Sequence, residues 1–358
     1  MKEMNNMRKI YLDNLRWATV ILVLIYHVCY IFNGLGIFGG IPDADTIVAF
    51  DAAASIVYPW FMVFLFVVAG MSARYSLQKR TTKQFLKERV QKLLVPSTLG
   101  LFVIHWITGY MNIKMGGALS SIPSFLIYPI SVLSGIGPLW FIQLLFIFSC
   151  IIVLLKKLDK SDKLWDICGR ANIIIILLLF FVVWGASFIL NAPILTTYRF
   201  GIYFASFTIG YFILSHDEIQ EQIEKIGIPA LIAAFILAVF YTKTFYGTNF
   251  TEPACLQNWL TNIYLWITVI ALLGFGKKFL NHKNNITEYL AKNSFGLYIL
   301  HYPVLTVTCY ILHYHTELAS IWKYLFAIII EFAATIIVNE IMKHIPFIRF
   351  LVLGYKKN

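Results

Sequence analysis

Long apolar segments recur along the chain and constrain its fold more than any other feature. Each is near the roughly 20 residues that a bilayer core requires. Hydrophobic residues make up 59% of the chain and charged residues 13%, about half the charged share of a soluble domain. We therefore predict an all-α integral membrane protein, a bundle of about ten transmembrane helices that forms a single domain over residues 1–358. The predicted spans cover about 13–32, 52–76, 93–113, 138–156, 171–190, 199–215, 228–245, 258–276, 294–312 and 321–344.

The positive charge is distributed as in a membrane protein. The net charge is +11, but the Lys and Arg residues gather in short connectors between apolar segments, and no basic stripe suited to nucleic acid is present. The most basic connector, 78–92, has a pattern typical of a helix along the membrane interface. The positive-inside rule predicts a multi-pass protein of the cell membrane with both termini in the cytoplasm.

The first predicted span carries Arg16 and His27, which a bilayer interior rarely accommodates. They are eleven residues apart, about three helical turns, so both side chains leave one face roughly 16 Å apart along the axis. Two interpretations fit this pattern. Either the two residues line a polar track along the helix, or Arg16 reaches the headgroups while His27 makes one hydrogen bond inside the bundle.

His27 is the best candidate for acid–base chemistry, because a neutral imidazole in an apolar wall can accept a proton. Arg16 carries a permanently charged fork of donors suited to phosphate or carboxylate. Asp13 precedes Arg16, and we predict that it caps the helix, with a secondary role in orienting Arg16.

Three further cations lie where the second and third predicted spans reach the cytoplasm: Arg74, Arg89 and Lys92. Each is explained most simply as a positive-inside anchor. With Arg16 they also form a candidate basic ring for a phosphorylated ligand.

Other polar side chains fall inside predicted spans and are candidates for supporting roles. His301 lies beside Pro303, and either supports the site or makes an interhelical hydrogen bond. Glu331 is costly in a membrane unless it is paired. Trp140 starts a span at the outer side, where an aromatic belt would also place it. His105 and Gln143 are further buried polar positions.

The sequence motifs that mark several common kinds of catalytic or metal site are absent from the chain. The chain has no G-x-S-x-G, no P-loop, no G-x-G-x-x-G and no H-E-x-x-H. His313 and His315 lack a third ligand, and the five cysteines are scattered without C-x-x-C spacing. We therefore expect no metal site and no tightly bound cofactor.

An ordered set of motifs resembles the membrane-bound acyltransferase family 3. Y-L-D-N-L-R-W-A opens the first span, and ten residues separate Arg16 from His27, as in the R-x10-H motif of that family. The resemblance continues in the family's order through L-F-V-V-A-G near 65–70, K-E-R-V-Q-K-L-L-V-P near 87–96, P-L-W-F at 138–141 and S-F-G-L-Y-I-L-H-Y-P at 294–303.

The resemblance implies an O-acyltransferase that moves an acetyl or other short acyl group from cytoplasmic acyl-CoA. The acceptor would be a hydroxyl of a cell-envelope carbohydrate or a similar molecule. It implies His27 as the catalytic base and Arg16 as part of the donor site. Related proteins often carry a second arginine where this chain has Lys92, and the extracellular hydrolase-like domain of some relatives is missing, so we expect a stand-alone form.

The residues and the resemblance lead to one hypothesis with two rivals. Arg16, with Arg74 and Arg89, holds the CoA phosphates, and His27 deprotonates the acceptor hydroxyl for direct transfer. The main rival is a multi-pass transporter or exporter of a polar solute, with Arg16 and His27 along its pathway. The third is a membrane sensor or assembly partner without enzymatic activity.

Overall fold

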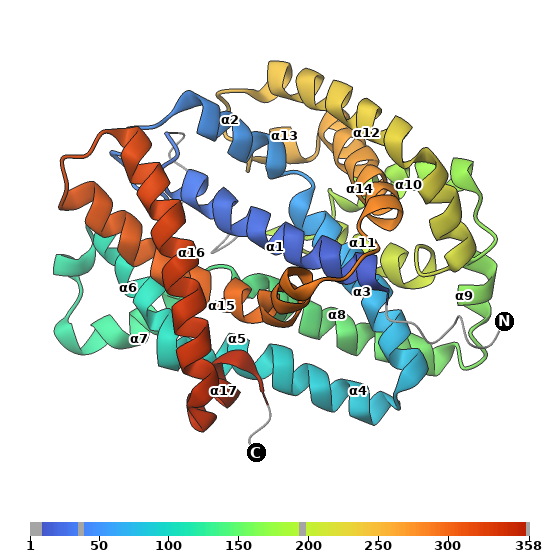
Figure 1. Ribbon diagram of the computed structural model, residues 1–358, viewed down its shortest axis with the longest axis horizontal. Coiled ribbons are helices and arrows are strands. Elements are labelled where there is room, and N and C mark those ends of the chain that lie inside the picture. Colours follow the sequence, from blue (N-terminus) through green and yellow to red (C-terminus); the bar gives the residue numbers. More distant parts are fainter. Residues whose placement is uncertain (1–8, 35–38, 193–197, 356–358) are drawn as a thin grey trace.

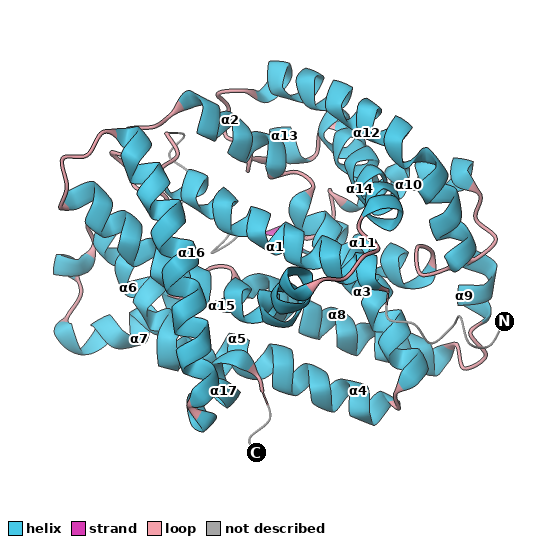
Figure 2. Cartoon of the chain, in the orientation of Figure 1, coloured by secondary structure: helices cyan, strands magenta, loops and turns pink. Residues whose placement is uncertain are grey.

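The structure, a computed structural model, describes residues 9–34, 39–192 and 198–355. Figures 1 and 2 show that helices make up almost all of the regular secondary structure in this part of the chain. A single antiparallel pair of two-residue strands, β1 (Asn191–Ala192) and β2 (Tyr198–Arg199), is the exception. The long helices are α1 (Ile10–Ile31), α3 (Phe61–Lys79), α8 (Leu139–Leu158), α12 (Asp217–Phe245), α14 (Trp259–Phe279), α15 (Asn285–Tyr314) and α16 (Ser320–His344).

Shorter helices complete the bundle and its ends. They are α2 (Val48–Val57), α4 (Thr82–Arg89), α5 (Val95–Gly100), α6 (Trp106–Met115), α7 (Ser124–Ser134), α9 (Lys163–Cys168), α10 (Ile173–Ala186), α11 (Phe200–Phe212), α13 (Pro253–Leu256) and α17 (Pro346–Leu353), with a 3₁₀ turn at Leu119–Ser121.

The helical membrane fold predicted from the sequence is confirmed, whereas the number of spans is not. Among the described residues, 8 continuous helical runs are long and apolar enough to cross a bilayer. The predicted spans 171–190 and 199–215 form α10 and α11, of 14 and 13 residues. At 1.5 Å per residue these are about 20 Å long, against a hydrocarbon core of about 30 Å. The predicted side of the termini stays a prediction, and residues 1–8 and 356–358 lie outside the described part.

The first span lies in the middle of the bundle (Figure 1). α1 contacts α2, α3, α14, α15 and α16, so its residues meet protein on most sides. Its side chains Val23 and Val28 are fully buried. A polar residue on this helix is therefore surrounded by other helices, as expected for ionisable groups at membrane depth.

Glycines let α3 and α11 pack with their backbones almost in contact. A Cβ atom at Gly70 would lie 2.0 Å from the carbonyl oxygen of Phe207, and one at Gly210 would lie 2.2 Å from that of Val67. Close backbone approach at small residues is a common way for helices to associate in membranes. This contact fixes the position of α3, which carries several side chains of the candidate site.

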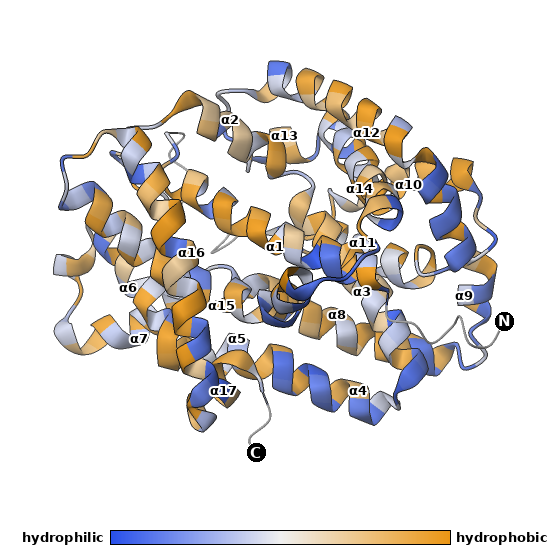
Figure 3. Ribbon diagram, in the orientation of Figure 1, coloured by the Kyte–Doolittle hydropathy of each residue, from blue (hydrophilic) through white to orange (hydrophobic). Residues whose placement is uncertain are grey.

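Hydrophobic residues predominate along the peripheral helices α12 and α16 (Figure 3). The peripheral helices α10, α12 and α16 expose large aliphatic and aromatic residues where a soluble protein would expose charges. Such surfaces fit contact with lipid chains. Examples are Ile174, Leu178, Phe181, Ile232, Phe235, Phe240, Ile329, Ile337 and Ile341.

Two π-helical segments interrupt the helical run Thr82–Met115. The first, Val90–Leu94, ends two residues before Pro96, which has no amide hydrogen, and the amide of Val95 donates to the carbonyl oxygen of Val90 five residues back. The second, Leu101–His105, ends at a buried histidine. The basic connector is thus the first part of the same helical run as the third span.

Candidate donor cavity and histidine pair

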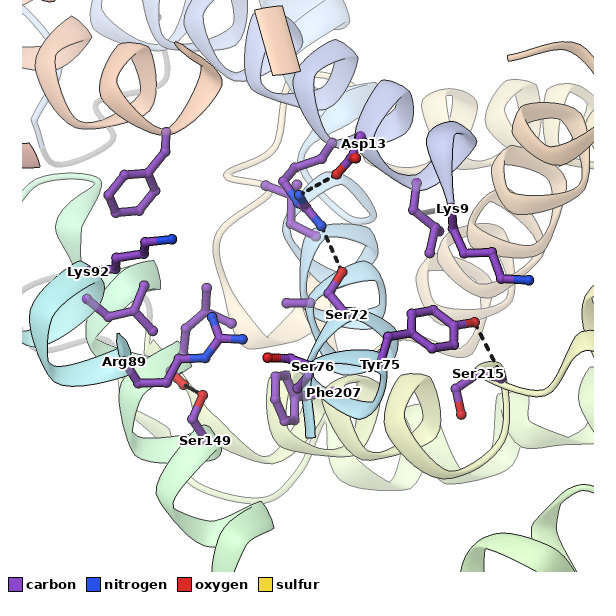
Figure 4. Close-up of a pocket in the computed structure, with 18 of the residues that line it drawn as sticks. Lys9, Asp13, Ser72, Tyr75, Ser76, Arg89, Lys92, Ser149, Phe207 and Ser215 are labelled. Atoms are coloured by element: carbon purple, nitrogen blue, oxygen red, sulfur yellow. Dashed lines mark hydrogen bonds and ion pairs between the residues drawn. The ribbon is translucent and has the colours of Figure 1, made fainter. Parts of the chain in front are cut away.

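A cavity of about 870 Å³ opens at the end of the bundle that is predicted to face the cytoplasm. Figure 4 shows Arg89 and Lys92 entering it from one side, opposite Asp13 of α1 and Ser72 of α3. Its mouth is lined by charged side chains, including Lys9, Arg16, Arg80, Glu88, Arg89, Lys92 and Asp217. Its depth is apolar, lined by Val20, Leu65, Phe141, Ile142, Leu145 and Tyr298. The cavity therefore suits a long ligand with an anionic end and an uncharged arm.

Arg16 points into this cavity from the second turn of α1. Its Nη1 lies 3.0 Å from Asp13 Oδ1, and its Nη2 donates to Ser72 Oγ at 2.7 Å. The prediction that Asp13 caps the helix is wrong, because α1 begins at Ile10 after Lys9, one turn earlier. The first turn continues through the polar residues before the apolar run, so Asp13 lies inside the helix and orients Arg16 across i,i+3.

Arg89 and Lys92 line the same cavity from the opposite side. The Lys92 ammonium pairs with Glu88 at 2.7 Å, and Glu88 also pairs with Arg80 at 2.8 Å. Arg89 has no carboxylate partner within the described part of the chain. Its guanidinium carbon lies 4.6 Å from the centre of the Phe85 ring, and its Nε is buried without a hydrogen bond there. Arg89 thus carries a positive charge that an anionic ligand could neutralise.

Arg74 does not join this group, since the cavity lining among the described residues includes its neighbours but not Arg74 itself. Its guanidinium binds both carboxylate oxygens of Asp162, at 2.8 and 3.2 Å, and stacks on Trp165 at 4.2 Å. The hydrogen bond from Arg74 lowers the pKa of the Asp162 carboxyl below its usual value. The contacts of Arg74 are those of a residue that ties α3 to the loop before α9.

His27 meets His301 in the interior of the bundle. The Nδ1 atom of His27 lies 2.9 Å from the carbonyl oxygen of Val23 and 3.2 Å from Nε2 of His301. His301 is fully buried, and its Nδ1 lies 2.7 Å from the carbonyl oxygen of Tyr298. The two residues are 274 positions apart. Each histidine is a candidate from the sequence alone, but no sequence spacing predicts that the two are in contact.

Aromatic rings surround this histidine pair. The His27 ring makes edge contacts with Tyr26, Tyr30 and Tyr302, with ring centres 5.2, 6.3 and 5.0 Å away. His27 is partly accessible, whereas its partner His301 is not. Of the two imidazoles, His27 is therefore the one that a ligand can reach.

The cavity and the histidine pair are neighbours along two helices. Val20, two turns before His27 on α1, and Tyr298, three residues before His301 on α15, both line the cavity. His27 itself is not among the described residues that line it. Arg16 and His27 leave the same face of one unbroken helix, as predicted, with the apolar end of the cavity between them.

The remaining candidates are not among the described residues that line the cavity. Trp140 stacks on Tyr203, with ring centres 5.2 Å apart. Glu331 is fully buried on α16, and neither of its carboxylate oxygens has a hydrogen-bond partner within the described residues. His105 is fully buried, and both of its ring nitrogens lack such a partner there too. Gln143 donates to the carbonyl oxygen of Ser97.

Sequence reasoning missed two residues of the site, Ser72 and Tyr298. Ser72 lies at the end of the second predicted span in A-G-M-S-A-R-Y-S, where a serine is unremarkable. Tyr298 precedes His301 by three residues, so the i,i+3 spacing could have linked the two. No signal in the sequence pairs Ser72 with Arg16.

Comparison with known proteins gives one match. The profile of a family described as an acyltransferase domain matches residues 9–340. No curated protein and no solved structure matches the chain. The matched range includes α1 to α15 and most of α16, and thus every residue of the histidine pair and all the cations of the cavity named above.

Proposed function

The chain belongs to this family of membrane acyltransferases, and from that premise we propose that it is an acyl-CoA-dependent O-acyltransferase. The acyl group is acetyl or another short acyl, and the acceptor is a hydroxyl of a cell-envelope carbohydrate or a similar molecule. The observation that carries the proposal is the juxtaposition of two features: a cavity with a cationic mouth and an apolar depth, and a reachable imidazole beyond its inner end.

The cavity mouth supports the choice of CoA as the donor. CoA carries its phosphates at one end and its thioester at the end of an uncharged pantetheine arm. Arg16, Arg89 and Lys92 offer guanidinium and ammonium donors to phosphates. Val20, Leu65 and Phe141 offer an apolar wall to the arm. The thioester would then lie toward His27, about 16 Å along α1 from Arg16.

The proposed reaction is a direct transfer with His27 as general base. The acceptor oxygen attacks the thioester carbonyl carbon as its proton moves to Nε2 of His27. The new C–O bond forms, the C–S bond breaks, and the departing CoA sulfur takes the proton from Nε2. The products are an ester and free CoA–SH, and no proton is gained or lost overall. His27 is a suitable base because none of the described residues donates a hydrogen bond to its Nε2.

The test is CoA release by the full-length protein purified in detergent or nanodiscs, supplied with acetyl-CoA and a panel of oligosaccharide acceptors. Release should depend on the acceptor, and mass spectrometry should find the acyl ester on it. His27→Ala should abolish both signals, because the remaining groups offer no equivalent base. His282→Ala, which alters an exposed loop histidine, should leave them unchanged.

The outcome separates the rival functions. Undiminished turnover by a folded His27→Ala protein would refute the role of His27. Uptake of a polar solute into proteoliposomes without acyl-CoA, together with no CoA release, would favour a transporter instead.

A further inference from the structure

We infer that His301 is a positioning residue that holds His27 in the tautomer with hydrogen on Nδ1, leaving Nε2 as the free base. The inference rests on the proposed function for its catalytic meaning, whereas the tautomer itself follows from hydrogen-bond geometry alone. It assigns a role to the contact between α1 and α15.

The first step concerns His301. A backbone carbonyl oxygen can only accept a hydrogen bond, so the 2.7 Å contact with Tyr298 requires that Nδ1 of His301 carries hydrogen. In a neutral imidazole the other nitrogen is then an acceptor. Nε2 of His301 therefore presents a lone pair, and it faces Nδ1 of His27 at 3.2 Å.

The second step concerns His27. Its Nδ1 has two neighbours, Nε2 of His301 and the carbonyl oxygen of Val23 at 2.9 Å, and both are acceptors. Nδ1 of His27 must therefore carry hydrogen, shared between them. The neutral ring then has its lone pair on Nε2. Free imidazole side chains favour hydrogen on Nε2, so this arrangement reverses the intrinsic preference.

The same arrangement also stabilises the protonated, positively charged form of His27. When Nε2 of His27 takes the acceptor proton, the positive charge spreads to the Nδ1–H group, which already points at the lone pair of His301. No carboxylate among the described residues hydrogen bonds to either ring. A neutral partner avoids burying a permanent negative charge at membrane depth, where carboxylates are costly.

The geometry predicts different effects on kcat for two substitutions of His301. Gln at this position retains an acceptor oxygen near the place of Nε2, whereas Leu has similar bulk and no acceptor. His301→Leu should lower kcat about 100-fold with little change in KM for acyl-CoA or acceptor, because the interactions with both substrates remain. The kcat of His301→Gln should be at least about ten times that of His301→Leu. A side chain with a merely structural role would not separate Leu from Gln in this way.

The tautomer is measured without reference to activity. Magic-angle-spinning NMR of the full chain in nanodiscs, labelled with ¹⁵N-histidine, distinguishes the two neutral tautomers by their nitrogen shifts. The His27 signals are assigned by their loss in His27→Gln. In the wild type they should report hydrogen on Nδ1, and in His301→Leu part of the signal should move to hydrogen on Nε2, because only the Val23 carbonyl then remains to accept from Nδ1.

Each result decides the inference. Hydrogen on Nε2 of His27 in the wild type would overturn it, whether or not the protein transfers acyl groups. An unchanged tautomer in His301→Leu, or equal kcat values for the Leu and Gln variants, would also overturn the role of His301. If the NMR result is as expected but no acyl acceptor is ever modified, the tautomer assignment stands and the proposed function fails.

Discussion

The contribution of Arg16 to the proposed CoA binding can be worked out from its contacts. A guanidinium has five N–H donors, and two of those on Arg16 are used by Asp13 and Ser72. Three donors therefore remain for phosphate oxygens. A hydrogen bond to a charged group is worth about 1.5–3 kcal/mol. The side chain is 38% exposed, so water screens the interaction and we expect the lower value, about 1.5 kcal/mol.

That value corresponds to about a tenfold change in affinity, since 1.4 kcal/mol is one factor of ten. Arg16→Ala should raise the Kd for CoA about tenfold, and somewhat more because the carboxylate of Asp13 would then face the phosphates. The Kd of Arg16→Lys for CoA should lie between those of the wild type and Arg16→Ala, because lysine keeps the charge and loses the planar fork. Asp13→Asn in the Arg16→Ala background should restore part of the loss.

Isothermal titration of the purified protein gives these constants directly. CoA is compared with pantetheine, which has the arm but no phosphates. Only CoA binding should weaken in Arg16→Ala, and the difference should shrink at high salt. Arg170→Ala is the matched control, because it removes an equal charge from an exposed loop. Equal Kd values for CoA in wild type and Arg16→Ala, or an equal loss for pantetheine, would refute the placement of phosphates at Arg16.

Two further predictions concern the scaffold. Gly70→Ala should destabilise the protein by about 1–3 kcal/mol, because the new Cβ would lie 2.0 Å from the Phe207 carbonyl oxygen. Gly185→Ala, which meets nothing within 4 Å, should be neutral or stabilising, and thermal-shift assays in detergent compare the two. Asp162→Asn should cost about 1 kcal/mol at neutral pH, where the carboxylate pairs with Arg74. Because the folded-state pKa of Asp162 lies below the usual 3.8, this stability is present above about pH 4 and is lost as the pH falls through the lowered value, so wild type and variant should converge in acid. A difference that persists below that pH would contradict the pairing.

Much of the fold could be predicted from composition and spacing. Each of the ten predicted apolar runs overlaps a helix of the structure, because a membrane leaves few other ways to satisfy the backbone. The same signal could not fix where helices end. α10 and α11 are shorter than their apolar segments, and α12 begins at Asp217, well before the apolar run, since polar turns can extend a helix into the headgroup region.

The candidate site was predictable only where one helix carries it. Arg16 and His27 lie on one face because helical geometry sets their spacing. The partnership of His27 with His301 depends on how α1 packs against α15, and Arg74 is tied to Asp162 by a loop that no periodicity describes. Glu331 is costly in a membrane unless it is paired, and no hydrogen bond within the described residues reaches its carboxylate.

The distribution of charge in the site follows from the energetics of the bilayer. Arg16, Arg89 and Lys92 stay charged at the predicted cytoplasmic end, where the cavity mouth is polar and a ligand can add its own anions. Beyond its apolar depth lie the imidazoles of His27 and His301, which can exchange a proton without a permanent charge in low dielectric. A donor that brings phosphates to the cavity mouth and a thioester toward His27 meets the cations where water reduces the cost of their charge, and meets an imidazole where a permanent charge would be costly. A transporter for a charged solute would instead need a polar path past His27, and the apolar residues Val20 and Leu65 occupy the corresponding depth.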